Sequence, residues 1–181
     1  MGQFRKLFSR MAGLTRRLSL FPKAYCKSAY DIDYEGLYQE GCRGVIFDID
    51  NTLVEDQQEA TKKAADLLEK IRRIGMEAFV LSNNHEERVR LFSEAVGARY
   101  IYEAGKPSAK GYIRAMEIMG TDRASTVFVG DQIYTDIWGA NNAGVFSILV
   151  PPVNPRELFH IRLKRLLELP VLMAYRLTNH V

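Results

Sequence analysis

Residues 44–54 read GVIFDIDNTLV, an apolar run that changes abruptly into a pair of carboxylates. The apolar part, Val45–Phe47, is rich in β-branched and aromatic residues and too short for a buried helix, so it predicts a strand. Because side chains alternate along an extended chain, Asp48 and Asp50 should point to the same side. The stretch therefore predicts a strand that ends in paired acids.

Similar apolar runs recur along the chain at residues 78–81, 100–102, 126–129 and 146–150. Between them lie segments with helical periodicity, 60–74, 86–96, 109–119 and 136–143, each followed by a glycine that could end a helix. This alternation predicts an α/β fold with a five-stranded parallel sheet and helices on both faces. We place Trp138, in the last of these segments, in the core.

Polar side chains follow several of these strands. Binding sites in such sheets form beyond the carboxyl ends of the strands, so these groups should gather at one edge. Carboxylates packed closely repel one another unless a cation lies between them. An all-oxygen set with few carboxylates suits Mg²⁺, which keeps several waters and binds substrate phosphate. The carboxylates expected to converge are Asp48, Asp50, Asp131 and Asp136, and Ser82, Asn83 and Lys106 also follow predicted strands.

Length and composition exclude several classes of protein. A chain of 181 residues that is 47% hydrophobic suits one domain with a full core and is not typical of disorder. Two isolated cysteines, Cys26 and Cys42, are too few for a disulfide framework and are interpreted as free thiols. No apolar run reaches the roughly 18 residues that a membrane-spanning helix needs.

Four motifs occur in order along the middle of the chain: VIFDIDNTLV, LSNN, GKP and VFVGDQIYTD. Together they resemble the haloacid dehalogenase (HAD) phosphatase superfamily, subfamily IIIA. The flanking stretches FPKAYCKSAYDIDYEGL and ILVPPV resemble its YqeG-type branch, which is similar to phosphatidylglycerophosphatases of the mitochondrial and plastid type. The resemblance runs from about Phe21 to the end of the chain and implies a HAD-like Rossmannoid sheet.

The resemblance also implies a role for each motif position. Asp48 would be the nucleophile that forms an aspartyl-phosphate, and Asp50 would be the general acid and base. Lys106 would neutralise charge on the nucleophile and the phosphate. The substrate phosphate would be bound by Ser82, the backbone N–H of Asn83, and Thr52, which would also pin the turn after Asp50. Mg²⁺ would be held by Asp48, the backbone carbonyl of Asp50, Asp131 and Asp136.

Each of these residues has a plainer interpretation when taken alone. Asp48 or Asp131 could form a strand-end turn, and the polar run from Ser82 could cap a helix. A response-regulator receiver domain also combines clustered aspartates, a lysine and Mg²⁺. However, it carries its phosphorylated aspartate at the end of the third strand and lacks paired acids at the first. Four motifs on successive strands favour the phosphatase.

The spacing of the motifs leaves no room for a cap domain. Asp48 and Ser82 are 34 residues apart, and Ser82 and Lys106 are 24 apart. We therefore expect an open site, which suits a phosphate displayed on something large, such as a lipid, a protein or a nucleic acid.

The basic residues gather at the ends of the chain. The net charge is only +3, yet residues 1–30 contain seven Lys and Arg and no Asp or Glu. A helix over Phe4–Leu18 would be basic and amphipathic, so we interpret residues 1–20 as a membrane-associating segment. Residues 21–181 form the phosphatase domain and include a basic C-terminal helix around Arg156–Arg165. Packing of both helices on the domain, or a mitochondrial transit peptide in place of the N-terminal segment, are the alternatives.

The motifs thus predict a Mg²⁺-dependent phosphatase. The family resemblance, together with the basic N-terminal segment, implies that it converts phosphatidylglycerophosphate to phosphatidylglycerol. Its expected partner is an anionic phospholipid surface, in the cytoplasm or alternatively in mitochondria. A soluble metabolite, nucleotide or phosphoprotein is the alternative substrate. An RNA- or ribosome-binding module is the third hypothesis, but no basic-aromatic recognition motif occurs, so no nucleic-acid partner is expected. The oligomeric state is left open.

Overall fold

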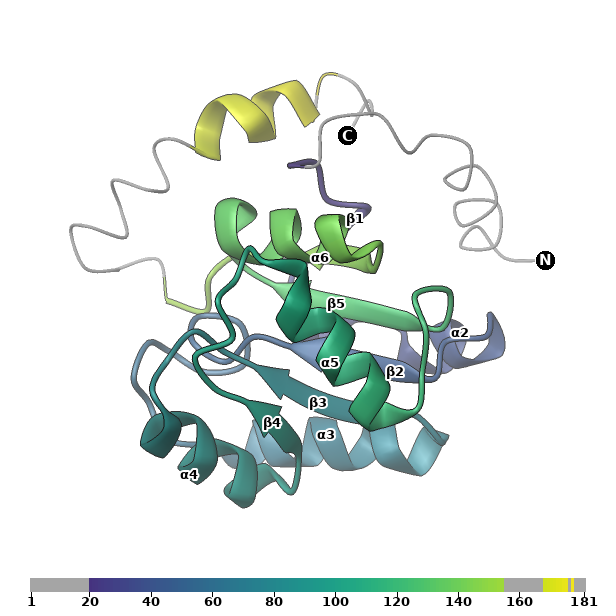
Figure 1. Cartoon of the computed structure of the whole chain (residues 1–181), viewed down its shortest axis with the longest axis vertical. Coiled ribbons are helices and arrows are strands. Elements are labelled where there is room, and N and C mark those ends of the chain that lie inside the picture. The colour runs from purple at the N-terminus through teal and green to yellow at the C-terminus, as the bar shows by residue number, and fades with distance from the viewer. Residues whose placement is uncertain (1–19, 155–167, 176, 178–181) are drawn as a thin grey trace.

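A computed structural model describes residues 20–154, 168–175 and 177. Its centre is a parallel sheet with the strand order β1-β6-β5-β2-β3-β4 (Figure 1). The predicted fold class is confirmed, but the predicted number of strands is wrong, because the sheet has six rather than five. The extra strand, β1, is only two residues long and pairs with β6, so it is too short to show any periodicity in the sequence. The strands are β1 (Ala24–Tyr25), β2 (Gly44–Phe47), β3 (Glu77–Leu81), β4 (Arg99–Ile101), β5 (Thr126–Gly130) and β6 (Phe146–Leu149).

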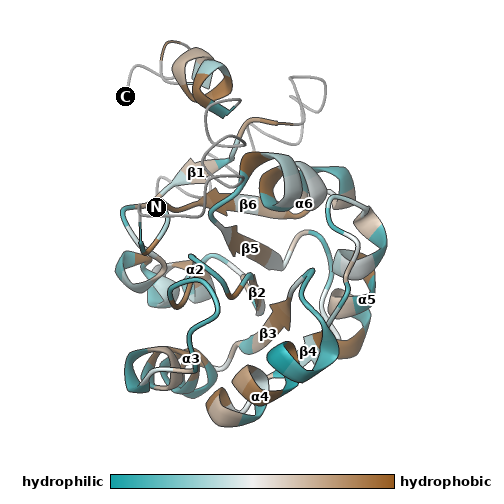
Figure 2. Ribbon diagram, turned by 90° about the vertical axis from the view of Figure 1, so that its left-hand side faces the viewer, coloured by the Kyte–Doolittle hydropathy of each residue, from teal (hydrophilic) through white to brown (hydrophobic). Residues whose placement is uncertain are grey.

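Helices cover both faces of the sheet, as expected (Figure 2). One face carries α2 (Tyr34–Gln39), α3 (Lys62–Ile74) and α4 (Glu86–Val96), and the other carries α5 (Ala109–Met119) and α6 (Trp138–Ala143). A short 3₁₀ helix, η1 (Ala29–Asp31), precedes α2. Alternate side chains of β2 enter the two cores: Val45 and Phe47 pack toward α3, whereas Ile46 packs toward α5. Burial on both faces explains why the strand reads as a continuous apolar run.

Local signals in the sequence account for the ends of α3. Thr61 caps its N-terminus, because the Thr61 hydroxyl accepts a hydrogen bond from the backbone N–H of Ala64. Gly75 ends it in the left-handed conformation, with φ of 98°. The helix therefore begins at residue 62, two residues later than predicted.

The predicted helix over residues 136–143 is preceded by a π-helix, η2 (Ile133–Ile137), and only then continues as α6. Asp136 Oδ2 accepts hydrogen bonds from the backbone N–H groups of Asp131 and Gln132, which draws η2 close to the end of β5. This approach requires a glycine at position 130, where a Cβ would lie 2.7 Å from the Asp136 side chain. Trp138, expected in the core, is 38% exposed instead; it begins α6, whose buried residues are Gly139, Ala140 and Ala143.

The strand order reverses between β2 and β5, the two central strands of the sheet. Loops diverge from such a switch point and leave a crevice beyond the strand ends. The two strands pair in parallel with Phe47 opposite Val129, and the Asp48 N–H donates to the Val129 carbonyl at 3.0 Å. The residues that follow β2 and β5 are therefore held side by side.

A helical segment at residues 168–175 lies against the edge of the domain near β1 and η2 (Figure 1). Val171 and Leu172 pack on Ile133, and Glu168 Oε1 accepts a hydrogen bond from the Ile133 N–H at 2.7 Å. The predicted helices at 4–18 and 156–165 lie outside the described residues. Across residues 20–154 no domain is inserted between the strands, in line with the expected absence of a cap. In the described part of the chain no helix has the length and apolar character to cross a bilayer.

Candidate active site

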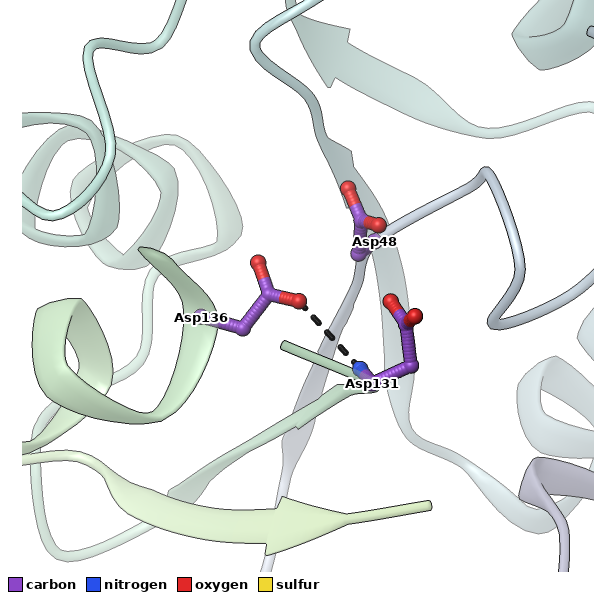
Figure 3. A group of neighbouring side chains, drawn as sticks. All are labelled: Asp48, Asp131 and Asp136. Carbon is purple, nitrogen blue, oxygen red and sulfur yellow. Dashed lines mark hydrogen bonds between the residues drawn. The ribbon is translucent and has the colours of Figure 1, made fainter. Parts of the chain in front are cut away.

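Three aspartates meet at the switch point between β2 and β5 (Figure 3). Asp48 follows β2, Asp131 follows β5 and Asp136 lies in η2. One carboxylate oxygen from each lies within 4.8 Å of the others. All three residues are nearly inaccessible, with exposures of 6%, 2% and 1%. The structure thus brings together three of the four residues predicted to hold a metal.

Lys106 lies between two of these aspartates. Its Nζ is 2.6 Å from Asp48 Oδ1 and 2.7 Å from Asp136 Oδ1, and its side chain is only 3% exposed. Burial by itself lowers the pKa of the ammonium group, but the charges of Asp136 and Asp48 outweigh it, so the pKa of Lys106 is raised overall. Lys106 is therefore a cationic bridge between Asp48 and Asp136.

The charges of this cluster do not balance. With all three carboxylates ionised, they would face one ammonium group and two negative charges would be in excess in a buried space. Burial raises the pKa of Asp48 well above its usual range; Lys106 opposes this shift, whereas Asp136 and Asp131 add to it. A divalent cation would supply the missing charge, and carboxylate oxygens are ligands that Mg²⁺ prefers. The chemistry of the donor set therefore fits a divalent metal ion.

We expect Mg²⁺ to raise the thermal stability of the protein. A ligand that binds only the folded state, present at a free concentration about 100 times its dissociation constant, adds about 2.7 kcal/mol to the free energy of unfolding. For a chain of this size that raises Tm by roughly 5–10 °C. Thermal unfolding with Mg²⁺ and with a chelator measures this shift without relying on catalysis. Asp131→Asn should remove most of it, whereas Asp66→Asn, at an exposed position on α3, should not. An equal shift in both variants would contradict a metal at this cluster.

The Asp50 side chain does not join the aspartate cluster. Its Oδ2 accepts from Asn84 Nδ2 at 2.6 Å, and its Oδ1 accepts from Arg88 Nη2 and from the Gln57 N–H, both at 2.9 Å. The expected contact of Asp50 with a metal is made by its backbone carbonyl, so the metal does not need the Asp50 side chain, which is the expected general acid and base. The sequence reasoning missed Arg88, which lies a full turn beyond the end of the SNN motif on α4.

The two predicted phosphate-binding residues after β3 behave differently from each other. Ser82 is 2% exposed, and its Oγ accepts from the Asn84 N–H at 3.1 Å, so it keeps its own hydrogen for donation. Asn83 binds the backbone of Lys106 on both sides: its Nδ2 donates to the Lys106 carbonyl and its Oδ1 accepts from the Lys106 N–H. The Asn83 side chain therefore fixes the loop that carries the bridging lysine.

Thr52 differs from the expected phosphate ligand. Its side chain hydroxyl donates to Asp131 Oδ1 at 3.2 Å, and the residue is 1% exposed. A hydroxyl committed to a carboxylate orients that carboxylate. In this structure Thr52 therefore supports a candidate metal ligand.

Tyr112 on α5 is a further supporting residue that the motifs did not indicate. Its hydroxyl lies 3.0 Å from the Asp136 carbonyl and 3.2 Å from the Thr135 carbonyl, so it donates to the backbone of η2. Burial raises the pKa of the Tyr112 phenol well above its usual range, so the proton stays on the phenol. No signal in the sequence connects Tyr112 with Asp136, because the contact depends on how α5 crosses the sheet.

Comparisons with known proteins agree with this geometry. Residues 55–144 match the family model for haloacid dehalogenase-like hydrolases. The chain is 37% identical over 161 residues to the probable phosphatase YqeG of Bacillus subtilis (strain 168), a match that covers 88% of this chain and 94% of that protein. It is 28% identical over 170 residues to phosphatidylglycerophosphate phosphatase 1, chloroplastic/mitochondrial, of Arabidopsis thaliana. That match covers 88% of this chain but only 49% of the plant protein.

Among solved structures, the fold is similar to a cobalt-bound deoxy-D-mannose-octulosonate 8-phosphate phosphatase (YrbI) from Haemophilus influenzae. The TM-score is 0.52 at 15% identity, and the match covers 61% of this chain and 69% of the other, so the likeness supports the fold alone. The identity to YqeG over nearly the whole length of both proteins is what shows the family. The chain belongs to the haloacid dehalogenase superfamily and is related to the probable phosphatase YqeG.

Proposed function

We propose that this protein is a Mg²⁺-dependent phosphomonoester hydrolase that works through an aspartyl-phosphate on Asp48. One observation carries the proposal: the Asp48 carboxylate lies at the switch point of the sheet, bound by Lys106 at 2.6 Å and beside Asp131 and Asp136. Mg²⁺ held by these carboxylates would neutralise the charge of the transferring phosphoryl group. The arrangement suits attack by one carboxylate on an anionic phosphate.

In the first step an Asp48 oxygen forms a bond to phosphorus while the bond from phosphorus to the ester oxygen breaks. Asp50 gives its proton to that departing oxygen, so an alcohol leaves. In the second step Asp50 takes a proton from water as the water attacks the same phosphorus. Inorganic phosphate departs and the Asp48 carboxylate is restored. Lys106 and the Ser82 hydroxyl would bind the phosphoryl oxygens, where fixed donors have the largest effect.

The substrate that we propose is phosphatidylglycerophosphate, with phosphatidylglycerol as the product. Two observations support it. The Arabidopsis relative carries this activity in its name. No domain inserted between the described strands encloses the site, so a phosphate on a lipid headgroup could approach it.

Exposed apolar side chains at the C-terminal end support a membrane surface as the place of reaction. Leu169, Met173 and Leu177 are spaced by four residues, as one face of a helix requires, and are 50%, 64% and 77% exposed. Their neighbours Val171 and Leu172 pack on the domain, so this stripe faces outward. The sequence from 151 to 181 also carries five basic and two acidic residues. Apolar and basic groups together favour an anionic bilayer, and a cytoplasmic or mitochondrial membrane remains our prediction.

Replacing Leu169, Met173 and Leu177 by glutamine should lower turnover of phosphatidylglycerophosphate in anionic vesicles by about tenfold or more. Each buried apolar side chain contributes about 1.5 kcal/mol or more to interfacial binding. Hydrolysis of a water-soluble phosphate ester should change less than twofold. Phosphate release from both substrates, with Mg²⁺ present, measures the difference. Deleting residues 1–20 should also lower turnover of the lipid more than turnover of the soluble ester.

Leu91→Gln is the matched control, because Leu91 is 53% exposed on α4. Helix α4 lies at the opposite end of the domain from the helical segment at residues 168–175 (Figure 1). The substitution should leave both activities unchanged. If the wild-type protein hydrolyses soluble esters readily and the lipid not at all, the substrate is a soluble metabolite, nucleotide or phosphoprotein. If it hydrolyses no phosphate ester but binds RNA in a salt-sensitive manner, the proposed function fails altogether.

A further inference from the structure

Arg88 makes an unusual ion pair at the edge of the site. Its Nη2 lies 2.9 Å from Asp50 Oδ1, and the two side chains are only 10% and 14% exposed. Among the ion pairs of the described residues, only those made by Arg88 and Lys106 are mostly shielded from water; the others join side chains that are at least 41% exposed. Arg88 belongs to none of the motifs that indicated the site.

The Asp50 carboxylate is held by three donors from three segments. Arg88 comes from α4, Asn84 from the loop after β3, and the Gln57 N–H from the loop after β2. Arg88 and Gln57 both bind Oδ1, whereas Asn84 alone binds Oδ2. Each carboxylate oxygen has two lone pairs, so Oδ1 is fully occupied and Oδ2 keeps one lone pair open. The geometry leaves Oδ2 as the oxygen that can exchange a proton.

The surroundings of the Arg88 side chain indicate that its contact with Asp50 sets its position. Its guanidinium lies 5.7 Å from the centre of the Phe92 ring, one turn farther along α4, and Phe92 is 1% exposed. Its Nε is buried and has no hydrogen-bond partner among the described residues. A buried donor without an acceptor is destabilising, so the hydrogen-bonding needs of Arg88 do not explain its position. Its contact with Asp50 does.

We propose that Arg88 is a positioning residue for Asp50: it holds Oδ1, so that Oδ2 faces the oxygen of the leaving alcohol. The inference rests on the proposed function, because it assumes that Asp50 transfers a proton. Proton transfer needs the two heavy atoms within about 2.6–3.2 Å, and a misplacement of about 1 Å can lower the rate by roughly 10²-fold. Without Arg88, the carboxylate could turn about its own axis and lose this alignment.

The test compares phosphate esters whose leaving groups differ in their need for a proton. Arg88→Met should lower kcat/KM for an alkyl phosphate by about 10- to 100-fold. For p-nitrophenyl phosphate the loss should be less than threefold, because nitrophenolate leaves without protonation. The parameter kcat/KM is informative because it reports the steps up to departure of the leaving group, and not the later hydrolysis of the aspartyl-phosphate. Arg88→Lys, which keeps a cationic donor, should recover part of the activity on the alkyl ester.

Two controls separate positioning from a structural role. Arg90→Met removes an exposed arginine of the same helix, paired with Glu94, and should leave both substrates unaffected. In an Asp50→Asn background, Arg88→Met should cause no further loss, because Arg88 acts through Asp50. An equal loss on both esters, or an additive loss in the double variant, would overturn the inference. If the wild-type protein is inactive on every ester, the proposed function fails and not only the role of Arg88.

Discussion

Asp48→Asn should reduce phosphatase activity by about 10⁴-fold or more, the scale seen when a catalytic nucleophile is removed. An amide is a poor nucleophile and carries no charge for a metal ion, so the variant can form no aspartyl-phosphate. The measurement is phosphate release from a soluble ester with Mg²⁺. Acid quenching during turnover of ³²P-labelled substrate should also trap a labelled wild-type protein and no labelled variant.

Loss of folding should not explain this result. Lys106 also contacts Asp136, at 2.7 Å, so it should keep a counter-charge when the charge of Asp48 is removed, and the substitution removes one repulsive carboxylate from the cluster. The variant should therefore unfold at a denaturant concentration close to that of the wild type. Asp66→Asn, which changes an exposed aspartate on α3, is the matched control and should remain fully active. Activity of Asp48→Asn above about a hundredth of the wild type would assign the nucleophile to another residue.

Lys106→Met should lower both activity and stability. It leaves Asp48 and Asp136 buried without their counter-charge, and breaking a buried ion pair in this way costs roughly 3–5 kcal/mol. Loss of a fixed positive donor at the reacting phosphate should lower kcat by about 10²- to 10³-fold. Urea unfolding in the presence of a chelator measures the first effect, and steady-state kinetics with Mg²⁺ measures the second.

The origin of the instability can be separated from the loss of side-chain packing. Mg²⁺ should restore part of the free energy of unfolding of Lys106→Met, because it supplies positive charge to the same carboxylates. The double variant Lys106→Met/Asp136→Asn should be more stable in the chelator than Lys106→Met alone. Lys110→Met, at an exposed position of α5, should have little effect. If neither Mg²⁺ nor the Asp136→Asn substitution raises the free energy of unfolding of Lys106→Met, the instability does not arise from unpaired charge.

Much of the fold could be predicted because its signals are local. The apolar run Val45–Phe47 indicated a strand, and the glycines that follow the helices indicated their ends. The misses have physical reasons as well. The strand β1 is too short for a periodic pattern and depends on pairing with β6. The π-helix η2 carries Asp136, which accepts hydrogen bonds from two backbone N–H groups near the end of β5, a contact that helical periodicity does not reveal.

In the site, too, the features set by local sequence could be predicted, whereas those set by long-range contacts could not. Residue types at the strand ends were enough to predict that Asp48, Asp131 and Asp136 would meet, because parallel strands bring their carboxyl ends to one edge of the sheet. The place of Lys106 beside them was implied by the family resemblance. The placement of Asp50 away from that cluster, and its contacts with Arg88 and Asn84, depend on where α4 packs. Such contacts join side chains more than 30 positions apart. Only the packing of the whole chain sets their distances, whereas the order of strands and polar residues can be read from the chain itself.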